Sequence, residues 1–460
     1  MSINKTNGIK WGPFTLRIPF IHIKLLPSEF VQGLLIAGAT ALAGVPVAMA
    51  LGLSLEQSVA VCFIASFLIT SSPLIFGEPM AAGWITPALP LVIAFFSSKG
   101  LYDGQYNDGE GFRYMAAMAI EFTFLVLILG VTGFGKILIE KIPNALKSGI
   151  ILGAAIAAFD QIFIDDYQTY IGNAPIATFT ILIICTITTF SEPFKRLGEN
   201  NKFIKIIASL GLLPGFVIAG LVGYFSGEIT WEFGEIFFVP PVGEVYQQTS
   251  PFVIGFPKLS YFLEVFPLVF IGYLLLFGDF ITGTEIIKEA QKNRPDEEID
   301  INLNRSHNSV GIRNLLGTII NPFFPTQGAL WTGVHVIVVQ RWQEGRDVMR
   351  SLFDGIGSYY LMGIPLLFFF GFFIDLMTPL VYLALGVTLI LTGIACSYVA
   401  MSLVKKNSEI AISIVTGFFV AFAEFKMNDQ MVAAPWIGIV IGLLLCFVLI
   451  DNTKLEKDIV

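Results

Sequence analysis

Long apolar stretches recur along almost the whole chain. From Val31 to Ile450 the sequence breaks into apolar runs of about 20 residues, the length at which a helix crosses the hydrocarbon core of a bilayer. Charged residues make up 13% of the 460 residues, whereas a soluble domain carries roughly 25%. The chain is therefore predicted to be an all-α polytopic membrane protein.

The apolar runs divide into about 14 predicted transmembrane spans. These lie at 31–53, 55–73, 76–97, 114–135, 145–163, 174–191, 203–226, 262–287, 311–323, 326–341, 354–376, 378–404, 408–424 and 433–450. Basic residues gather in the connections that this count makes cytoplasmic, among them Arg305 and Arg313, and acidic residues gather in the others. Both termini are therefore predicted to be cytoplasmic, in a multi-pass protein of the cell membrane. Since no targeting segment is recognised, a bacterial inner membrane is expected.

Proline and glycine interrupt the third and the tenth span. In residues 76–87 and 325–333 an extended piece is predicted to precede a half-helix, which starts near Pro87 in the first case and near Thr332 in the second. Because the two spans are an odd number apart, their half-helices run in opposite directions and their N-termini meet near the midplane. Such ends suit an anion or a hydrogen-bonding solute, and paired interruptions indicate a transporter site. The alternative is two kinked helices that bind nothing.

Asp279 lies well inside the eighth span. A carboxylate at that depth costs about 2.5–3.5 kcal/mol, so it should face the protein interior or water. We predict that Asp279 binds substrate or, with the neighbouring Thr282, a coupling cation. The structural alternative is an aspartate that pairs with a threonine or a backbone group.

Other polar and aromatic residues of the interrupted spans complete the candidate site. Glu78 is either a second coupling-ion residue or a solvated cap at the cytoplasmic mouth. Trp84 and Trp331 either sandwich a flat ring or fill space. Thr86 and Thr332 are expected to cap the half-helices. The predicted substrate-binding residues are Trp84, Thr86, Asp279, Gln327, Trp331 and Thr332, and the predicted coupling-ion residues are Asp279, Thr282 and Glu78.

Four short patterns along the chain resemble known permeases. They are Gln32 with Gly38-Ala39-Thr40 and Pro46; Phe76-Gly77 running to Thr86-Pro87; Ile142-Pro143 with Gly149 and Gly153; and Asn304 with Gly311 and Asn314. Together they resemble the nucleobase–cation symporters (uracil and xanthine permeases) and the related sulfate permeases. The resemblance departs at the tenth span, where the glutamate of uracil permeases corresponds to Trp331 or Thr332. No arginine of the sulfate permease kind stands before Arg341 there.

The resemblance implies a definite architecture. Two inverted repeats of seven spans would form a core domain (31–135 and 262–376) and a gate domain (145–226 and 378–450), with cytoplasmic ends at 1–30 and 451–460. The substrate site would lie between the third, eighth and tenth spans, and a homodimer is often formed. The C-terminal cytoplasmic domain of sulfate permeases is expected to be missing.

These observations favour a secondary active transporter coupled to H⁺ or Na⁺. A small polar organic solute, nucleobase-like, is preferred because the site is acidic and amide-bearing without a basic residue. The alternatives are an inorganic or carboxylate anion and, in another class, an anion channel. No enzyme motif, metal site or cofactor is recognised. The net charge of −8 gives no support to a nucleic-acid partner.

Overall fold

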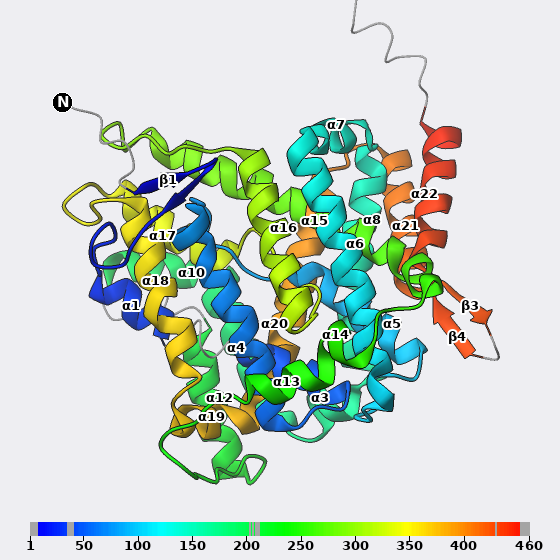
Figure 1. Ribbon diagram of the computed structural model, residues 1–460, viewed down its shortest axis with the longest axis horizontal. Coiled ribbons are helices and arrows are strands. Elements are labelled where there is room, and N and C mark those ends of the chain that lie inside the picture. Colours follow the sequence, from blue (N-terminus) through cyan, green and yellow to red (C-terminus); the bar gives the residue numbers. More distant parts are fainter. Residues whose placement is uncertain are drawn as a thin grey trace, which may run out of the picture.

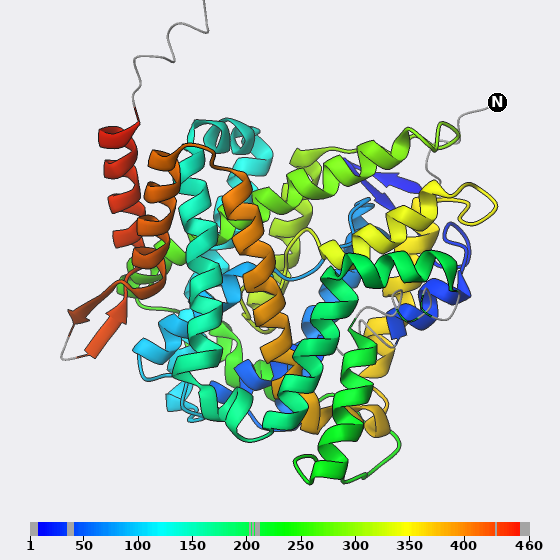
Figure 2. The same cartoon turned by 180° about the vertical axis from the view of Figure 1, so that it is seen from behind.

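The computed structural model describes residues 8–34, 41–201, 204, 207, 212–427 and 430–450. Figures 1 and 2 show that this part of the chain is almost entirely helical. In it, five helical segments are long and apolar enough to cross a membrane: Leu55–Phe76, Asn107–Thr132, Asn144–Asp165, Leu259–Gln291 and Gly371–Ser402. The bent pair Pro175–Thr188 and Glu192–Gly198 would make six, and shorter apolar helices lie at Thr86–Ser98, Pro214–Ser226, Asn407–Phe422 and Pro435–Leu449. The predicted helical, multi-pass class is confirmed.

The helices pack into two groups. The first contains α1 (Pro27–Gln32), α3 (Val45–Ala50), α4 (Leu55–Ser71), α6 (Glu110–Thr132), α15 (Leu259–Gln291), α16 (Leu303–Ile320), α17 (Thr332–Gln343) and α18 (Leu352–Leu367). The second contains α8 (Asn144–Asp160), α9 (Pro175–Phe190), α12 (Leu213–Ser226), α20 (Val381–Ser402), α21 (Asn407–Phe422) and α22 (Pro435–Leu449). Helix α5 (Leu89–Ser98) contacts α8 and so joins the groups.

Shorter elements connect these helices. They are η2 (Leu42–Gly44), η3 (Ser72–Phe76), η4 (Thr86–Ala88), η5 (Asn107–Gly109), α7 (Phe134–Lys141), η6 (Gln161–Asp165), η7 (Gln168–Gly172), α10 (Glu192–Asn200), α13 (Val242–Thr249), α14 (Pro251–Ile254), α19 (Gly371–Met377) and η8 (Thr378–Leu380). The predicted spans 31–53 and 203–226 lie partly outside the described residues, and the ends 1–7 and 451–460 lie wholly outside them.

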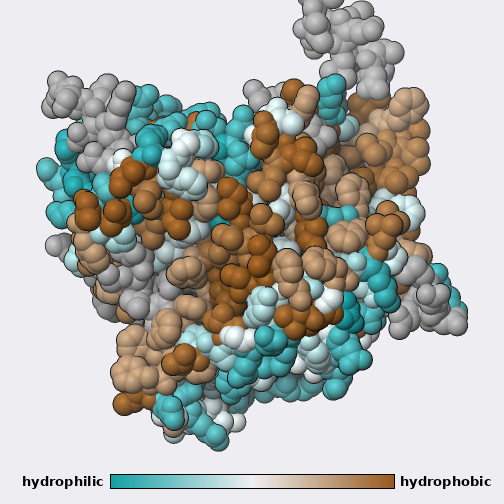
Figure 3. All heavy atoms as spheres, in the orientation of Figure 1, coloured by the Kyte–Doolittle hydropathy of each residue, from teal (hydrophilic) through white to brown (hydrophobic). Residues whose placement is uncertain are grey.

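Apolar side chains cover much of the outer surface. Phe124 is 61% exposed, Leu263 76% and Phe447 79%. Figure 3 shows hydrophobic residues gathered across the middle of one face, with hydrophilic residues along its lower edge. Apolar surface on this scale is unusual for a water-soluble monomer and fits a surface that faces lipid.

Two β-hairpins interrupt the helical pattern. Strands β1 (Ile9–Trp11) and β2 (Phe14–Leu16) pair antiparallel, and the indole N–H of Trp11 donates to the carbonyl of Ile75 at 2.8 Å. Strands β3 (Glu424–Met427) and β4 (Gln430–Ala433) form the second hairpin, between α21 and α22. In Figure 1, β1 and the end of α22 lie at the same edge of the molecule.

The placement of Arg305 and Arg313 in a cytoplasmic connection is wrong. Both lie within α16, which begins at Leu303, and their side chains are only 4% and 1% exposed. Counting basic residues between apolar runs fails here, because a buried arginine is tolerated where acidic groups and carbonyls satisfy its donors.

Candidate functional site

The two interrupted spans meet through their extended pieces. Residues 81–85 run antiparallel to residues 325–331 and share three backbone hydrogen bonds. These are Ile85 N–H to Pro325 O at 2.9 Å, Gly328 N–H to Gly83 O at 2.8 Å and Trp331 N–H to Ala81 O at 2.6 Å. Backbone groups inside a membrane must find partners within the protein. The pairing provides those partners, and the predicted extended pieces of the third and tenth spans are confirmed.

Glycine permits the close approach of the two pieces. A Cβ atom added at Gly83 would lie 2.7 Å from the Cβ atom of Trp331, and one at Gly328 would lie 2.8 Å from the Gly83 carbonyl oxygen. Any larger residue at either position would push the paired segments apart.

Each extended piece leads directly into a half-helix. The first begins at η4 and continues as α5, and the second is α17. The residues before them, Ile85 and Trp331, provide no side-chain cap. The expectation that Thr86 and Thr332 cap these ends is therefore wrong. Since the first N–H groups of a helix have no partner inside it, both ends carry a partial positive charge.

Asp279 lies on α15, which contacts both η4 and α17. Its side chain is half-buried, and within the described residues its carboxylate has no hydrogen-bond or ion-pair partner. The structural alternative of an aspartate paired with a threonine therefore does not hold. From the second helix group, Cys396 of α20 lies within electrostatic reach of Asp279.

Open space adjoins this carboxylate and the start of α17. A Cβ atom added at Gly278 or at Gly333 would meet no atom within 4 Å. Thr282 and Thr332 are likewise exposed, and Thr86 is half-buried. Helix α15, which carries Asp279 and Thr282, contacts both η4 and α17, the elements that begin with Thr86 and Thr332.

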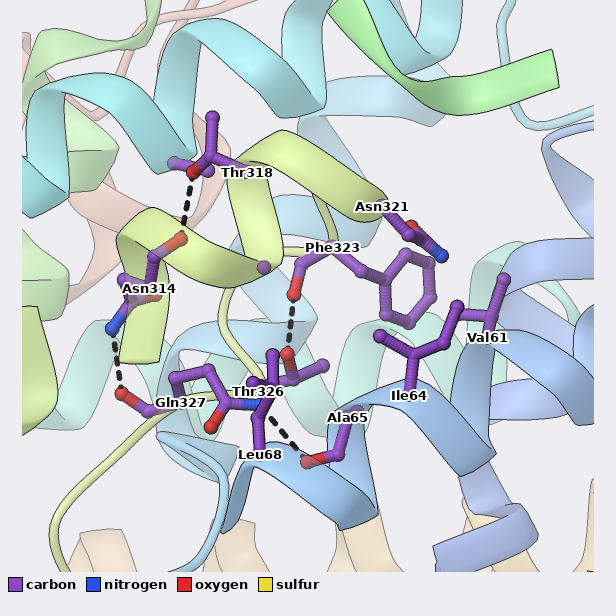
Figure 4. Close-up of a pocket in the computed structure, with 12 residues that line it drawn as sticks. Val61, Ile64, Ala65, Leu68, Asn314, Thr318, Asn321, Phe323, Thr326 and Gln327 are labelled. Atoms are coloured by element: carbon purple, nitrogen blue, oxygen red, sulfur yellow. Dashed lines mark hydrogen bonds between the residues drawn. The ribbon is translucent and has the colours of Figure 1, made fainter. Parts of the chain in front are cut away.

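Gln327 serves the structure of the second extended piece (Figure 4). Its side-chain oxygen accepts from Arg313 at 3.2 Å, and its amide nitrogen donates to the carbonyl of Ala65 on α4 at 3.0 Å. The amide of Asn314 donates to the Gln327 backbone carbonyl at 2.9 Å, and Arg313 donates to that of Gly328 at 2.9 Å. Both the oxygen and the nitrogen of the Gln327 side-chain amide thus have partners within the protein.

Glu78, at the start of the first extended piece, is only 4% exposed. One oxygen of its carboxylate accepts from the guanidinium of Arg305 at 2.9 Å, and the other accepts from the hydroxyl of Ser306. Glu78 is therefore not a solvated cap. The role of Glu78 as a coupling-ion residue stays a prediction. The structure shows that its carboxylate already has a cationic partner, Arg305.

His335 and Tyr360 hold the rest of the first extended piece. The Nδ1 atom of His335 accepts from the Ala81 N–H at 3.3 Å, and its Nε2 atom lies 3.2 Å from the carbonyl oxygen of Gly283. The hydroxyl of Tyr360 donates to the Ala82 carbonyl. His335 thereby joins the extended piece to both α15 and α17.

The two predicted aromatic residues are packed against protein. The ring of Trp84 would be 2.3 Å from a Cβ atom added at Gly44, and it lies edge-on to Phe323 at 6.4 Å between centroids. Trp331 pairs with the first extended piece through its backbone and packs its Cβ atom on Gly83. These contacts favour the space-filling interpretation of both side chains.

Sequence reasoning missed the residues that hold the extended pieces, above all Arg305, Arg313 and Tyr360. A signal was present, because Asn314 belongs to one of the patterns shared with permeases and Arg313 precedes it. Taken alone, the two basic side chains indicated a loop. Only the fold shows that Arg313 holds the second extended piece and that Arg305 reaches the Glu78 carboxylate of the first.

Comparison with known proteins gives similarity of structure alone. No protein-family model matches the chain, and no curated protein matches it. Among solved structures, the transmembrane domain of a cyanobacterial bicarbonate transporter, BicA, is 14% identical with a TM-score of 0.43, over 93% of this chain and 98% of that one. The murine anion transporter Slc26a9, in its inward-facing state, is 13% identical with a TM-score of 0.49, over 94% and 69%. Another SLC26A9 structure is 13% identical with a TM-score of 0.49, over 92% and 65%.

Proposed function

We propose that the protein is a cation-coupled transporter of a small anion. The observation that carries the proposal is the pairing of two uncapped half-helices whose starts adjoin the same paired segments. Two helix N-termini present free N–H groups and about half a positive charge each. A small anion is the solute that such a cradle suits best.

The structure removes the reasons for preferring a nucleobase-like solute. That preference rested on an amide and on carboxylates free to bind a polar ring. The Gln327 amide is occupied by Arg313 and Ala65, and Glu78 is paired with Arg305. Trp84 packs the edge of its ring on Gly44, as a space-filling side chain does. The anion alternative needs none of these groups.

Asp279 supplies the reason for coupling. A carboxylate and an anion 4 Å apart repel by about 4 kcal/mol at an effective dielectric constant of 20. Each helix end contributes typically 0.3–1 kcal/mol and at most about 2. The dipoles alone therefore do not overcome the repulsion. A proton or Na⁺ bound at Asp279 removes it, so cation and anion bind together.

Transport would follow from movement of the first helix group against the second. The half-helices and Asp279 lie in or beside the first group, whereas α8 and α20 cover η4 from the second. We propose that the two groups act as the core and gate domains. One contact between them, from the Ala433 N–H to the Ser98 hydroxyl at 2.9 Å, would break when the groups move apart.

Uptake into proteoliposomes tests the proposal. Labelled bicarbonate, sulfate and chloride would be compared with uracil, each with and without an imposed H⁺ or Na⁺ gradient. We expect saturable, gradient-dependent uptake of one anion, no uptake of uracil, and loss of the gradient dependence in Asp279→Asn. Uracil uptake would overturn the anion class, and unsaturable, gradient-independent flux would show a channel.

A further inference from the structure

A groove of ≈ 460 Å³ lies between α6 and α15, away from the paired half-helices. It is lined by Ile120, Glu121, Phe124, Leu125, Leu259, Phe262, Phe266 and Val269. Phe124 is 61% exposed, Leu259 79% and Phe266 53%. Both helices are long enough to span the membrane, and the exposed apolar lining fits a surface that faces lipid. Seven of its eight lining residues are apolar, and the remaining one is a carboxylic acid.

Glu121 lies in the middle of α6, a helix long enough to span the membrane. It is the twelfth of the 23 residues of α6 (121 − 110 + 1 = 12). At 1.5 Å per residue it is about 17 Å from either end of the helix. Its Oε2 atom is buried and has no hydrogen-bond partner within the described residues. A carboxyl group at this depth normally faces the protein interior or a partner, so its position in a lipid-facing groove calls for an occupant.

Helix α15 contains a proline within the stretch that lines the groove. Pro267 lies inside the helix, between the lining residues Phe266 and Val269. Proline has no N–H, so the carbonyl of Leu263, four residues earlier, loses its usual helical donor. The lining residues themselves include one carboxylic acid and no basic side chain.

The depth of Glu121 restricts what can satisfy it. A phospholipid head group stays at the interface, and an acyl chain carries no donor. The lining runs from Leu259, the first residue of α15, to Val269. Ten residues of helix cover about 15 Å, which is half of the hydrocarbon core. A slender molecule with a polar end that reaches the midplane would fit this length.

We propose that the α6–α15 groove binds a lipophilic amine, with its ammonium group on the Glu121 carboxylate and its aliphatic chain along the apolar lining. An ammonium group has three donors and one positive charge, which match the unpartnered acidic oxygen. An ammonium ion that meets the Glu121 carboxylate and a neutral amine that takes the proton of the Glu121 carboxylic acid both give the same ammonium–carboxylate pair. The site is separate from the half-helices and does not depend on the transported solute.

The test uses the full chain in lipid nanodiscs with dodecylamine, and with dodecanol as a probe of equal chain length. We expect dodecylamine to raise the melting temperature of the wild type and of Asp279→Asn, and to have no effect on Glu121→Gln. Dodecanol should shift none of the three. Equal shifts by amine and alcohol, or an amine shift that persists in Glu121→Gln, would overturn the proposal.

A second measurement does not depend on the folding of the variant. Dicyclohexylcarbodiimide modifies carboxylic acids in apolar surroundings, and mass spectrometry locates the adduct. In the wild type we expect dodecylamine to slow the total modification of Glu121 at least tenfold, counting both the carbodiimide adduct and the dodecylamide that the activated carboxyl would form with this primary amine. Dodecanol should leave the total rate unchanged. Modification at the same rate with and without the amine would show that only lipid chains fill the groove, and would overturn the proposal.

Discussion

The two interrupted spans share one plan but are held in place by different chemistry. The first extended piece is anchored at its start by a buried ion pair, Glu78 with Arg305. The second is anchored by neutral amides and by Arg313, which donates to two acceptors of that piece. The start of the first half-helix, η4, contacts α8, α15 and α20, whereas the second begins at Thr332, where the next residue, Gly333, adjoins open space. We therefore propose that the first forms a fixed wall of the site and that the second provides access.

Removing Glu78 should have the largest effect on stability. In Glu78→Ala the buried guanidinium of Arg305 keeps only Asp300, which is 58% exposed, as a carboxylate partner. Breaking a buried pair in this way costs about 3–5 kcal/mol. We expect a marked fall in the melting temperature, measured in nanodiscs.

A surface pair provides the control for that experiment. Glu285 and Lys288 lie 2.8 Å apart on α15, and both are more than half exposed. Glu285→Ala should change the melting temperature very little, because exposed pairs of this kind contribute about 0.3–0.5 kcal/mol. Equal effects of the two substitutions would show that the first extended piece does not depend on its ion pair.

Substitutions at two glycines test the proposed roles of the two half-helices separately. Gly83→Ala places a Cβ atom 2.7 Å from that of Trp331 and should cost about 1–3 kcal/mol. Gly333→Ala meets no atom within 4 Å and should leave the melting temperature unchanged while it slows anion uptake. Normal uptake by Gly333→Ala would place the route of access elsewhere.

The sequence alone predicted the two extended pieces and the position of Asp279 well inside its span. Proline and glycine are rare enough in apolar runs to mark both extended pieces, and the depth of Asp279 is readable from the run around it. The anchors were not predictable in the same way. Gln327 and Arg313 are 14 residues apart in the sequence, and Glu78 and Arg305 are 227 apart. Both pairs depend on how separate segments pack in the fold, which a local sequence pattern does not contain.

The contact between Ser98 and Ala433 should have a smaller effect. Ser98 ends the first half-helix and accepts from the hairpin between α21 and α22, so it ties the wall to the second helix group. Ser98→Ala loses one hydrogen bond of about 1 kcal/mol. That shifts a two-state equilibrium by about fivefold.

Thiol labelling at Gly333→Cys reports this shift, because all four native cysteines are buried. If breaking the contact lets the groups rearrange and close the space at Gly333, labelling should slow in the double variant with Ser98→Ala. The control is Ser397→Ala, since Ser397 donates only to Gly393 of its own helix at 2.8 Å. The same labelling rate with Ser98→Ala and with Ser397→Ala would show that the contact does not control access.

The smallest effect concerns the loop between α15 and α16, which lies outside the membrane-spanning helices. The guanidinium of Arg294 donates to Asp296 at 2.9 Å, and this hydrogen bond lowers the pKa of the Asp296 carboxyl. A lowered pKa in the folded state means that Asp296 stabilises the protein above its unfolded pKa of about 3.9, and that this stabilisation is lost as the pH falls through the folded value. The Asp296 side chain is 28% exposed, so its contribution to the free energy of unfolding is at most about 1 kcal/mol.

We expect the melting temperature of the wild type to fall more than that of Asp296→Asn between pH 5 and pH 3. Parallel curves would show that the other partners of Arg294, among them the carbonyls of Trp342 and Met349, hold the guanidinium without help from Asp296.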